Sequence, residues 1–535
     1  MNKILLYFNT LKYLKLKQLS YRSFYKLRSS FRKGIYFRYQ LTKESSAYEV
    51  MLKNSIINNN TFFKENTFVF LNKRHNFDKN IDWNYQKNGK LWTYNLTYFD
   101  FLCQQNIDKE NGLILINSFI FQIEDIKDGL EPFPISLRGM NWIKFLVKYK
   151  IKEKKINNSL YAQYYILLDN LEYHLLGNHL LENGFSLLFG AYYFQDEKFY
   201  AKAKKILTHE LEEQILDDGA HFELSPMYHQ IMLFRVLDCI NLIQNNDWKN
   251  QEMLHLFVSK AKIMFGWLNA ITFENGSIPL LNDSANKIAP TTKQLNHYAV
   301  NLQLKHQPSN ITPKLKESGY RKIKNKRYEM ILDVGNIGPD YIPGHAHSDT
   351  FNFELYVDNE PVIVDTGLST YETNDRRQVE RSTKSHNTVE VDNEEQSEVW
   401  GGFRVARRAK IVELIETSGK IKATHDGYIK KRILHTREFI TQEEQIIIID
   451  SIDAKKQHSC VAYIHFYPNI DIQVNGKELL CKYLTLNSSS CIELIEYDYS
   501  PEFNTKTNAQ SAKLLFNNKL EIKIRIKKER ESEND

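Results

Sequence analysis

The 535-residue chain is poor in the residues that interrupt or cross-link a chain. It has 12 prolines and 21 glycines, which excludes collagen-like and proline-rich low-complexity proteins. Its five cysteines are widely spaced and include no CxxC pair, so we expect neither a disulfide framework nor a cysteine-type zinc site. Long apolar runs are also missing. Because a transmembrane helix needs roughly 18 such residues in a row, none is expected.

A large excess of charge of one sign is missing as well. The chain has 71 Lys and Arg against 65 Asp and Glu, a formal net charge of +6. Such a mild excess does not indicate a nucleic-acid partner, and it is compatible with a local basic groove for an acidic polymer. Aromatic residues are abundant, with 31 Tyr, 31 Phe and 6 Trp. They fit large cores, or rings that line a sugar-binding cleft.

Residues 1–80 begin with a basic amphipathic sequence that does not read as a signal peptide. A short apolar run follows Lys3, a basic cluster interrupts it, and no small-residue cleavage site follows. The sequence therefore predicts an N-terminal basic helical segment and a cytoplasmic protein, with the periplasm or secretion by another route as the alternative. Loose association of this segment with an anionic membrane surface is a further hypothesis.

The hydrophobic period changes near the middle of the chain, and a chain of this length is expected to form more than one domain. Residues 81–305 carry apolar residues at helical spacing, which predicts an all-helical domain. Residues 306–320 have two prolines and no period, which is typical of a linker. Residues 321–535 alternate with period two and turn at Asp358–Asn359, which predicts an antiparallel β-sandwich. The expected fold class is therefore α+β with several domains.

Two clusters in the helical half could carry chemistry. Asn178 and His179 stand in the leucine-rich stretch GNHLLENG, where they fit either a capped helix end or the mouth of a cleft. Tyr228 follows Ser225 and Pro226, a pair typical of a helix start. Because a helix N-terminus favours anions, we expect a lowered pKa for Tyr228 and a role as proton acceptor, with an ordinary core tyrosine as the alternative.

A third cluster lies in the β half. The HxH pair of His345 and His347 would place both imidazoles on one face of a strand. His347, Asp365 and His386 could together supply two nitrogens and one oxygen, a set that suits zinc first and manganese second. Taken alone, an HxH pair is more often a pair of core histidines.

The motifs GNHLLENG, ELSPMYHQ, PGHAHSDTFNFEL, VDTG and SHNTVEVD occur in one order with the aromatic segments LWTYNLTYFDFL and PISLRGMNWIKF. Together they resemble the heparinase II/III family of polysaccharide lyases over roughly residues 85–450. The resemblance implies an incomplete (α/α) toroid followed by an antiparallel β-sandwich, with an active-site cleft between them. It implies cleavage of uronic-acid polysaccharides by β-elimination. The catalytic positions that it implies are Asn178, His179, Tyr228 and His345, and the implied metal ligands are His347, Asp365 and His386.

Each implied group has a chemical reason. Asn178, with His179 or His345, can donate hydrogen bonds to the uronate carboxylate, where charge develops when the C5 proton leaves. Tyr228 can take that proton and return it to the leaving oxygen, and His345 or His179 can serve when the proton lies on the opposite ring face. The expected cofactor is one divalent metal, zinc or else manganese or calcium, with a structural role in holding the loop that presents His345.

Further residues are expected to position an anionic chain, because the planar fork of Arg matches carboxylate and sulfate groups. They are Asn95, Arg138, Asn141, Trp142, Glu182, Tyr371, Arg376, Arg377, Arg381, Trp400 and Arg404. The expected substrates are heparan sulfate, chondroitin or dermatan sulfate, hyaluronan, or alginate. A catalytically silent uronan-binding protein and a metal-dependent glycan hydrolase are the alternatives. The oligomeric state stays open.

Overall fold

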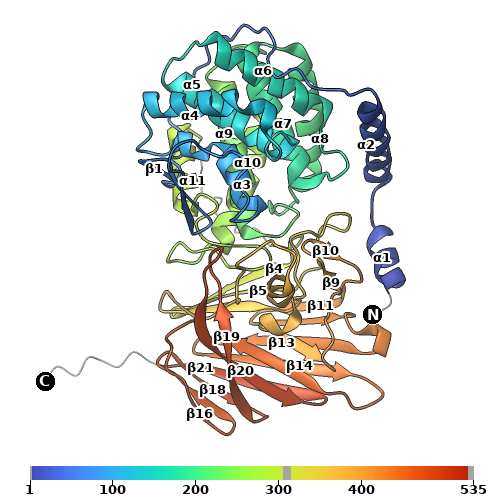
Figure 1. Cartoon of the computed structure of the whole chain (residues 1–535). Helices are drawn as coiled ribbons and strands as arrows, with labels where there is room; N and C mark the ends of the chain where they lie inside the picture. The colour runs from blue at the N-terminus through green and yellow to red at the C-terminus, as the bar shows by residue number, and fades with distance from the viewer. Residues whose placement is uncertain (1–2, 305–314, 528–535) are drawn as a thin grey trace, which may run out of the picture.

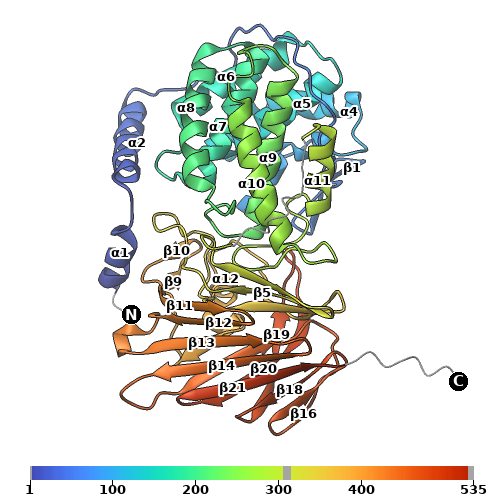
Figure 2. The ribbon, with the colours of Figure 1, turned by 180° about the vertical axis from the view of Figure 1, so that it is seen from behind.

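The computed structural model describes residues 3–304 and 315–527, and it consists of two domains stacked end to end (Figure 1). A helical domain lies above a β domain, and two N-terminal helices run along one side of both (Figures 1 and 2). No helix among the described residues is long and apolar enough to cross a membrane. Most of the expected linker, residues 305–314, lies outside the described residues.

The helical domain is an incomplete toroid of helices that share one large apolar core. Its helices are α3 (Lys90–Tyr98), α4 (Lys109–Phe121), α5 (Pro132–Lys148), α6 (Lys154–Asp169), α7 (Gly177–Phe194), α8 (Glu197–Gln214), α9 (Pro226–Gln244), α10 (Leu254–Ile271) and α11 (Thr292–Asn301). Helix α7 is the central one, since all its residues except His179 are buried. A helix that is apolar all round belongs in the interior, so the exposure of His179 needs a separate reason.

The β domain is antiparallel throughout its named strand pairs. A four-stranded sheet next to the toroid holds β4 (Tyr320–Lys324), β5 (Tyr328–Asp333), β6 (Phe353–Val357) and β7 (Glu360–Ile363). A second four-stranded sheet holds β19 (Ile492–Tyr499), β20 (Thr507–Phe516), β15 (Cys460–His465) and β8 (Val389–Val391). The short strands β9 (Val399–Trp400) and β10 (Arg404–Val405) form a hairpin of their own.

The largest sheet has eight strands and forms the far layer of the domain. In order it holds β11 (Ile411–Thr417), β12 (Lys420–His425), β13 (Leu434–Thr441), β14 (Gln445–Asp453), β21 (Lys519–Ile526), β18 (Leu484–Ser488), β17 (Glu478–Leu480) and β16 (Gln473–Asn475). Along β14 and β21 the buried isoleucines alternate with more exposed residues, as a sheet with one inward face requires. The predicted turn at Asp358–Asn359 is confirmed, with φ of 50° and 66°.

Two expectations about local structure are wrong. The HxH pair lies in the loop between β5 and β6 and not on a strand. In the N-terminal segment 1–80, the helices α1 (Lys3–Leu11) and α2 (Leu16–Gly34) are followed by extended chain. Three short strands then pair, β1 (Phe62–Phe63), β2 (Thr67–Phe70) and β3 (Lys73–Asn76). A left-handed turn at Glu65–Asn66 joins the first two, and such a turn selects a hairpin over a helix.

The helices α1 and α2, which we call the arm, tie the two domains together on one side. Helix α2 is held to the toroid by Arg32, whose guanidinium lies 2.6 Å from the Asp169 carboxylate. Helix α1 is held to the β domain, because the indole of Trp400 donates to Thr10 at 3.1 Å. The arm therefore spans the junction of the domains, where a shared site would lie (Figure 1).

Candidate active site

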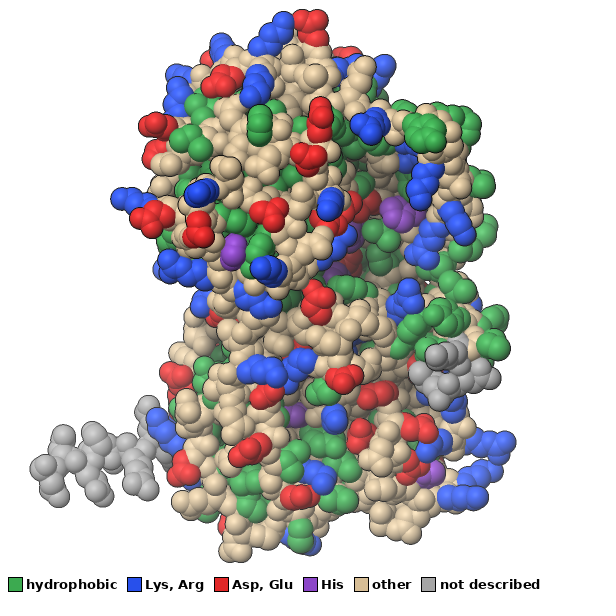
Figure 3. All heavy atoms as spheres, in the orientation of Figure 1, with side chains coloured by type: hydrophobic (Ala, Val, Ile, Leu, Met, Phe, Trp, Pro, Cys, Tyr) green, Lys and Arg blue, Asp and Glu red, His purple; other side chains and the backbone are tan. Residues whose placement is uncertain are grey.

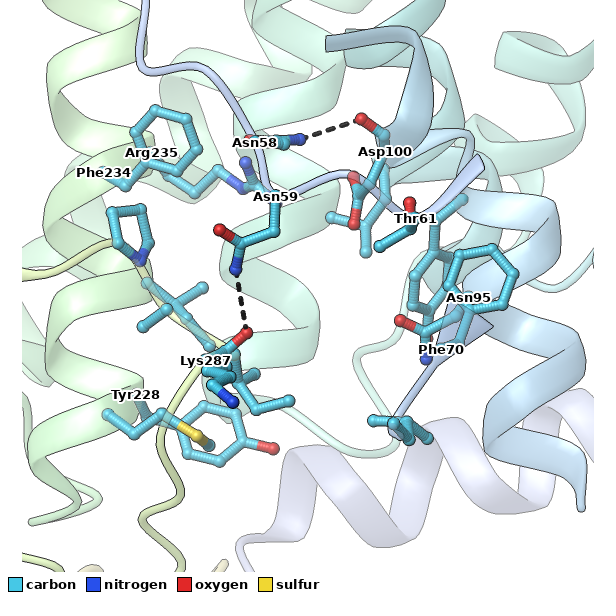
Figure 4. A pocket seen from close by; sticks show the side chains of 18 of the residues that line it. Asn58, Asn59, Thr61, Phe70, Asn95, Asp100, Tyr228, Phe234, Arg235 and Lys287 are labelled. Carbon is cyan, nitrogen blue, oxygen red and sulfur yellow. Dashed lines mark hydrogen bonds between the residues drawn. The ribbon is translucent and has the colours of Figure 1, made fainter. Parts of the chain in front are cut away.

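A cleft of about 280 Å³ lies at the junction of the two domains. Its walls come from the toroid, from the extended chain before β1, and from β-domain loops that contribute Tyr371 and Phe503. Figure 4 shows Tyr228 at one wall and Asn59 reaching across towards the carbonyl oxygen of Lys287. The predicted site residues that line the cleft are Asn95, Asn178, Glu182, Tyr228 and Tyr371.

Tyr228 stands at the start of α9, as predicted from the helix-start pair. Ser225 is the N-cap, and its hydroxyl accepts from the Tyr228 N–H at 3.3 Å. The Tyr228 ring packs on the His345 imidazole with centroids 4.0 Å apart, and its hydroxyl lies 3.4 Å from that of Tyr371. The fold therefore brings two predicted catalytic residues into contact from different domains.

The expected lowering of the Tyr228 pKa is wrong. Burial raises the pKa of Tyr228 well above that of a free phenol, and the Tyr371 hydroxyl offsets this only in part. The nearby carboxylates of Asp283 and Glu223 raise the pKa further. Desolvation and the two buried acids raise the pKa of Tyr228 by more than the positive end of α9, with an effective charge of about half a unit, can lower it. At rest Tyr228 is a neutral phenol, which is a proton donor.

A buried carboxylate, Asp283, holds the histidine loop in place. It accepts from His345 Nδ1 at 2.9 Å and from His347 Nε2 at 2.8 Å. Arg377 donates to both its oxygens, at 2.5 and 2.6 Å. Burial opposes the charge of Asp283, but Arg377 and the hydrogen bonds of His345 and His347 together outweigh burial and keep the pKa of Asp283 well below its usual range. An ionised carboxylate can only accept, so His345 Nδ1 carries a proton and donates it to Asp283.

A second buried carboxylate, Glu223, links Asn178 to His345. The Asn178 backbone N–H donates to Glu223 at 3.2 Å, and its side-chain amide donates at 3.1 Å. The Glu223 oxygen that accepts from the side-chain amide, Oε2, also lies 3.6 Å from His345 Nε2. The Asn178 side-chain oxygen is buried and has no hydrogen-bond partner within the described chain. An unpartnered acceptor at a cleft wall is free to bind a substrate donor.

A third carboxylate, Glu172, supports His179. The His179 Nδ1 lies 3.0 Å from Glu172 Oε1, and its imidazole keeps 37% of its surface exposed beside Phe133. Partial burial opposes the charged form, but Glu172 outweighs burial and raises the pKa of His179. His179 is thus a cation at the edge of the cleft more often than a free imidazole would be.

Both catalytic helices follow a strained residue. Leu176 precedes α7 with a φ of 65°, and Leu224 precedes the cap of α9 with a φ of 55°. A left-handed leucine costs about 1–2 kcal/mol, so surrounding contacts must hold it in place. At Leu224 the backbone carbonyl accepts from Asn282 and from the Tyr320 hydroxyl. The strain bends the chain sharply into each helix start, where the catalytic side chains stand.

The predicted metal ligands lie in the same buried region. His386 Nδ1 is 2.8 Å from Asp365 Oδ2, and the rings of His347 and His386 are 5.2 Å apart. His347 Nδ1 and His386 Nε2 are buried without a partner in the described residues, as is one oxygen of Asp349. These orphaned donor atoms fit a cation. Among the described residues, a different group has its possible metal-ligand atoms all within 4.8 Å of one another. That group is His209, Glu210 and Glu213.

Besides Arg377, which is buried and binds Asp283, four of the expected substrate contacts are wrong, because their side chains are buried in protein. Trp142 packs on Phe99 and Phe119 in the toroid core. Arg138 donates to Gln163 and to the Thr97 carbonyl. The other two are Asn141, which is bound to Tyr98 and Asp100, and Arg381, which is bound to the carbonyls of Ala346 and Gly402. These four side chains therefore hold the protein's own backbone and pack its core.

The remaining basic and aromatic candidates lie in different places. Trp400 and Arg404 stack on each other beside the arm and do not line the cleft. Arg376 pairs with Glu380 and Asp498. Glu182 lines the cleft and forms a buried pair with Arg235 at 3.0 Å.

Sequence reasoning missed the residues that hold the catalytic groups. Asp283 stands in no motif, although it lies in a short polar run, Asn282 to Ser284, that directly follows an apolar one. Glu223 stands inside the quoted motif ELSPMYHQ, just ahead of its predicted tyrosine. Arg235 follows Tyr228 by seven residues, so helical spacing alone places both on one face of α9. Lys287, which also lines the cleft, pairs with Glu502 of the β domain at 2.8 Å.

The sequence matches two family models in succession. Residues 144–307 match "Heparinase II/III N-terminus", and residues 307–528 match "Heparinase II/III-like, C-terminal". The chain belongs to the heparinase II/III family. It is similar to a "Heparin-sulfate lyase" of Bacteroides stercoris, 21% identical over 311 residues that make up 54% of this chain and 45% of that protein. A "Heparin-sulfate lyase" of Pedobacter heparinus is 22% identical over 41% of this chain and 36% of its own. The chain thus spans less than half of these relatives.

Solved structures share the fold of this heparinase II/III member. A crystal structure titled heparinase III superposes with a TM-score of 0.66 at 16% identity, over 84% of this chain and 80% of its own. A Streptomyces coelicolor chondroitin AC lyase gives a TM-score of 0.52 at 7% identity, over 83% and 75%. At these identities the likeness shows the architecture, a helical toroid followed by β sheets.

Replacing Asp283 by Asn should destabilise the protein by roughly 3–5 kcal/mol, because Arg377 would then be buried without its counter-charge. Urea unfolding measures this. The matched control is Asp498→Asn, which removes the partner of the neighbouring Arg376 at a site that is 41% exposed. Because exposed pairs contribute little, the control should cost at most about 1 kcal/mol. Equal losses in both variants would contradict a special role for Asp283.

The raised pKa of His179 makes part of the stability depend on pH. Its charged form gains stability that is fully present below the ordinary imidazole pKa and is lost as pH rises through the raised pKa. Replacing Glu172 by Gln should lower the pKa of His179, measured by NMR titration of its ring protons. The variant should also lose more unfolding free energy at acidic than at alkaline pH. Glu443→Gln, which removes an acid that is 70% exposed and makes no contact with His179, should change neither. An unshifted titration in Glu172→Gln would contradict the assignment.

Proposed function

We propose that this protein is a polysaccharide lyase that cleaves uronic-acid chains of the glycosaminoglycan type by β-elimination. The observation that supports this most directly is the contact of Tyr228 with His345 at a cleft between two domains. Asn178 lines the same cleft, and His179 packs beside Phe133, which also lines it. Family membership and relatives that carry the name heparin-sulfate lyase support the proposal. A silent uronan binder would have no use for a buried tyrosine held against an oriented histidine.

The substrate carboxylate would be bound first. The His179 imidazolium, supported by Glu172, can face the uronate carboxylate. The Asn178 amide nitrogen is held by Glu223, and its free side-chain oxygen can accept from a sugar hydroxyl next to that carboxylate. The charge of His179 favours the extra negative charge that forms on the carboxylate when the C5 proton leaves. Both groups are held by protein contacts before substrate arrives, so little reorganisation is needed at the moment of reaction.

The hydrogen bonds of His345 and Tyr228 assign the proton transfers in this proposal. His345 Nε2 takes the C5 proton, because Asp283 holds the ring proton on Nδ1 and stabilises the imidazolium. The C5–H electrons form the C4–C5 double bond, the C4–O4 bond breaks, and the neutral Tyr228 phenol gives its proton to O4. The imidazolium then returns a proton to the Tyr228 phenolate, whose ring lies against it. The cycle consumes no water and restores both groups.

We further propose one divalent metal with a structural role, zinc before manganese or calcium. His347 and His386, each with one ring nitrogen that is buried and unpartnered in the described chain, would bind it together with Asp365, which contacts the His386 ring. When bound, it would supply a fixed, charged anchor for the loop from His345 to Asp349. His345 itself stays bound to Asp283, so the proton transfers do not pass through the metal.

The first test is the ultraviolet absorbance of the full chain incubated with heparan sulfate, heparin, chondroitin and dermatan sulfates, hyaluronan and alginate. A lyase leaves a C4–C5 double bond that absorbs where the polymer does not. Tyr228→Phe should lower turnover by about 10²–10⁴-fold and keep binding, since it removes only the transferred proton. Tyr193→Phe is the control, because that hydroxyl binds Asn157 in the toroid core.

Three results would count against the proposal. Binding of a polymer with flat absorbance would favour a silent binder. New reducing ends without absorbance would favour a hydrolase. Full turnover by Tyr228→Phe would remove the tyrosine from the mechanism.

Metal content tests the structural role. The purified chain should carry about one equivalent of zinc by mass spectrometry, and His386→Ala should lose it because two protein ligands hold a divalent ion poorly. Chelation should lower the thermal midpoint before it lowers turnover. His458→Ala, a surface histidine paired with Asp392, should keep its metal. Immediate loss of turnover with an unchanged midpoint would instead indicate Lewis-acid catalysis.

A further inference from the structure

The arm presents an apolar stripe that faces away from the rest of the protein. On α2 the stripe holds Leu16, Phe24, Leu27 and Phe31, which are 81%, 51%, 72% and 67% exposed. Their spacing of three, four or eight residues places them on one helix face. The opposite face of α2 is the one that binds the toroid, through residues such as Gln18 and Arg32.

Helix α1 continues the stripe. Phe8 and Leu11 are 63% and 49% exposed, while Tyr7 and Thr10 contact Trp400 of the β domain. Figure 3 shows hydrophobic and basic side chains along the arm on the face that it presents. Large apolar side chains gathered on one outward face mark an interaction surface, whereas isolated ones do not.

The charge of this segment is equally one-sided. Residues 1–43 hold 11 Lys and Arg and no Asp or Glu. The other residues hold 60 Lys and Arg against all 65 Asp and Glu, a formal charge of −5. The positive net charge of the chain therefore comes entirely from its N-terminal segment. Lys26 and Lys33 are exposed on α2, and Lys12 is exposed directly after α1.

We propose that the arm is a docking surface for an anionic lipid bilayer. A helix with an apolar face and basic flanks lies in the plane of a membrane, with its apolar side chains at the acyl boundary and its lysines among anionic headgroups. The combination favours lipid over the other partners. A polyuronate would bind the lysines but offers nothing to Leu16 and Leu27. A second arm would match the apolar stripe but would repel its charge.

Docking would also fix which side of the protein faces the bilayer. The arm lies on one side of the junction of the two domains, whereas β1 and α11, near which several cleft residues lie, are on the opposite side (Figures 1 and 2). A bilayer that binds the arm would therefore leave this wall of the cleft uncovered.

The test is co-sedimentation of the full chain with sucrose-loaded vesicles of phosphatidylcholine, with or without phosphatidylglycerol. The chain should bind the anionic vesicles and be released by salt. The triple variant Phe24→Ser, Leu27→Ser, Phe31→Ser should bind at least about tenfold more weakly, and so should Lys26→Glu with Lys33→Glu. Thermal midpoints should not change, because these side chains point outwards.

The matched control replaces three exposed apolar residues off the arm, Phe121→Ser, Val300→Ser and Leu515→Ser, which are 85%, 65% and 52% exposed. It should bind vesicles like the original chain. Equal binding by the arm variants, or no binding to anionic vesicles, would overturn the proposal. Evidence for another partner would also overturn it. Such evidence would be a dimer in light scattering that is lost in the triple variant, or binding to a polyuronate that is lost in the lysine variant.

Discussion

The geometry of the active site depends on the charge of one buried residue, Asp283. It comes from the chain between α10 and α11 of the toroid, whereas its three partners, His345, His347 and Arg377, belong to the β domain. A carboxylate without water must find its compensation in protein, and here that compensation lies across the domain junction. The two domains must therefore dock for the ion pair to form, and docking brings the His345 ring against Tyr228. Folding of the interface and assembly of the catalytic pair are one event.

The same device recurs at the other catalytic side chains. Glu223 fixes Asn178, and Glu172 fixes His179, each through a carboxylate that is itself largely buried. Every predicted catalytic donor or acceptor except Tyr228 is thus oriented by an acid behind it. Tyr228 instead is oriented by a helix start and by ring packing. This division fits the chemistry, because a buried acid supports a cation or an amide but raises the pKa of a phenol.

The sequence allowed the architecture and the motif residues to be predicted, and much less of what surrounds them. The change of hydrophobic period predicted the α+β fold class, a helical half followed by a β half. Asp358–Asn359 and Ser225 form the turn and the cap that their residue types predict, since turns and caps depend on neighbours in the chain. The prediction that the HxH pair lies on a strand was wrong, because Asp283, some sixty residues away, determines its conformation. Trp142 and Arg138 failed as substrate contacts because an amphipathic period does not distinguish the wall of a cleft from a core. The prediction of a lowered pKa for Tyr228 was wrong, because the burial of Tyr228 depends on the β domain that docks against it.

The charge distribution carries a further consequence for how a polyanion is bound. A formal charge of +6 suggests general attraction to uronans, yet without the N-terminal segment the chain is net negative. Charges on the arm act over about a Debye length, roughly 8 Å in physiological salt, so they do not set the potential inside the cleft. There the cations are few and already paired, as Arg235 is with Glu182 and Lys287 with Glu502. On the proposed function, affinity for a uronan would then arise from short-range contacts with His179, Asn178 and the cleft walls, and such contacts would favour a weakly charged chain over a densely sulfated one.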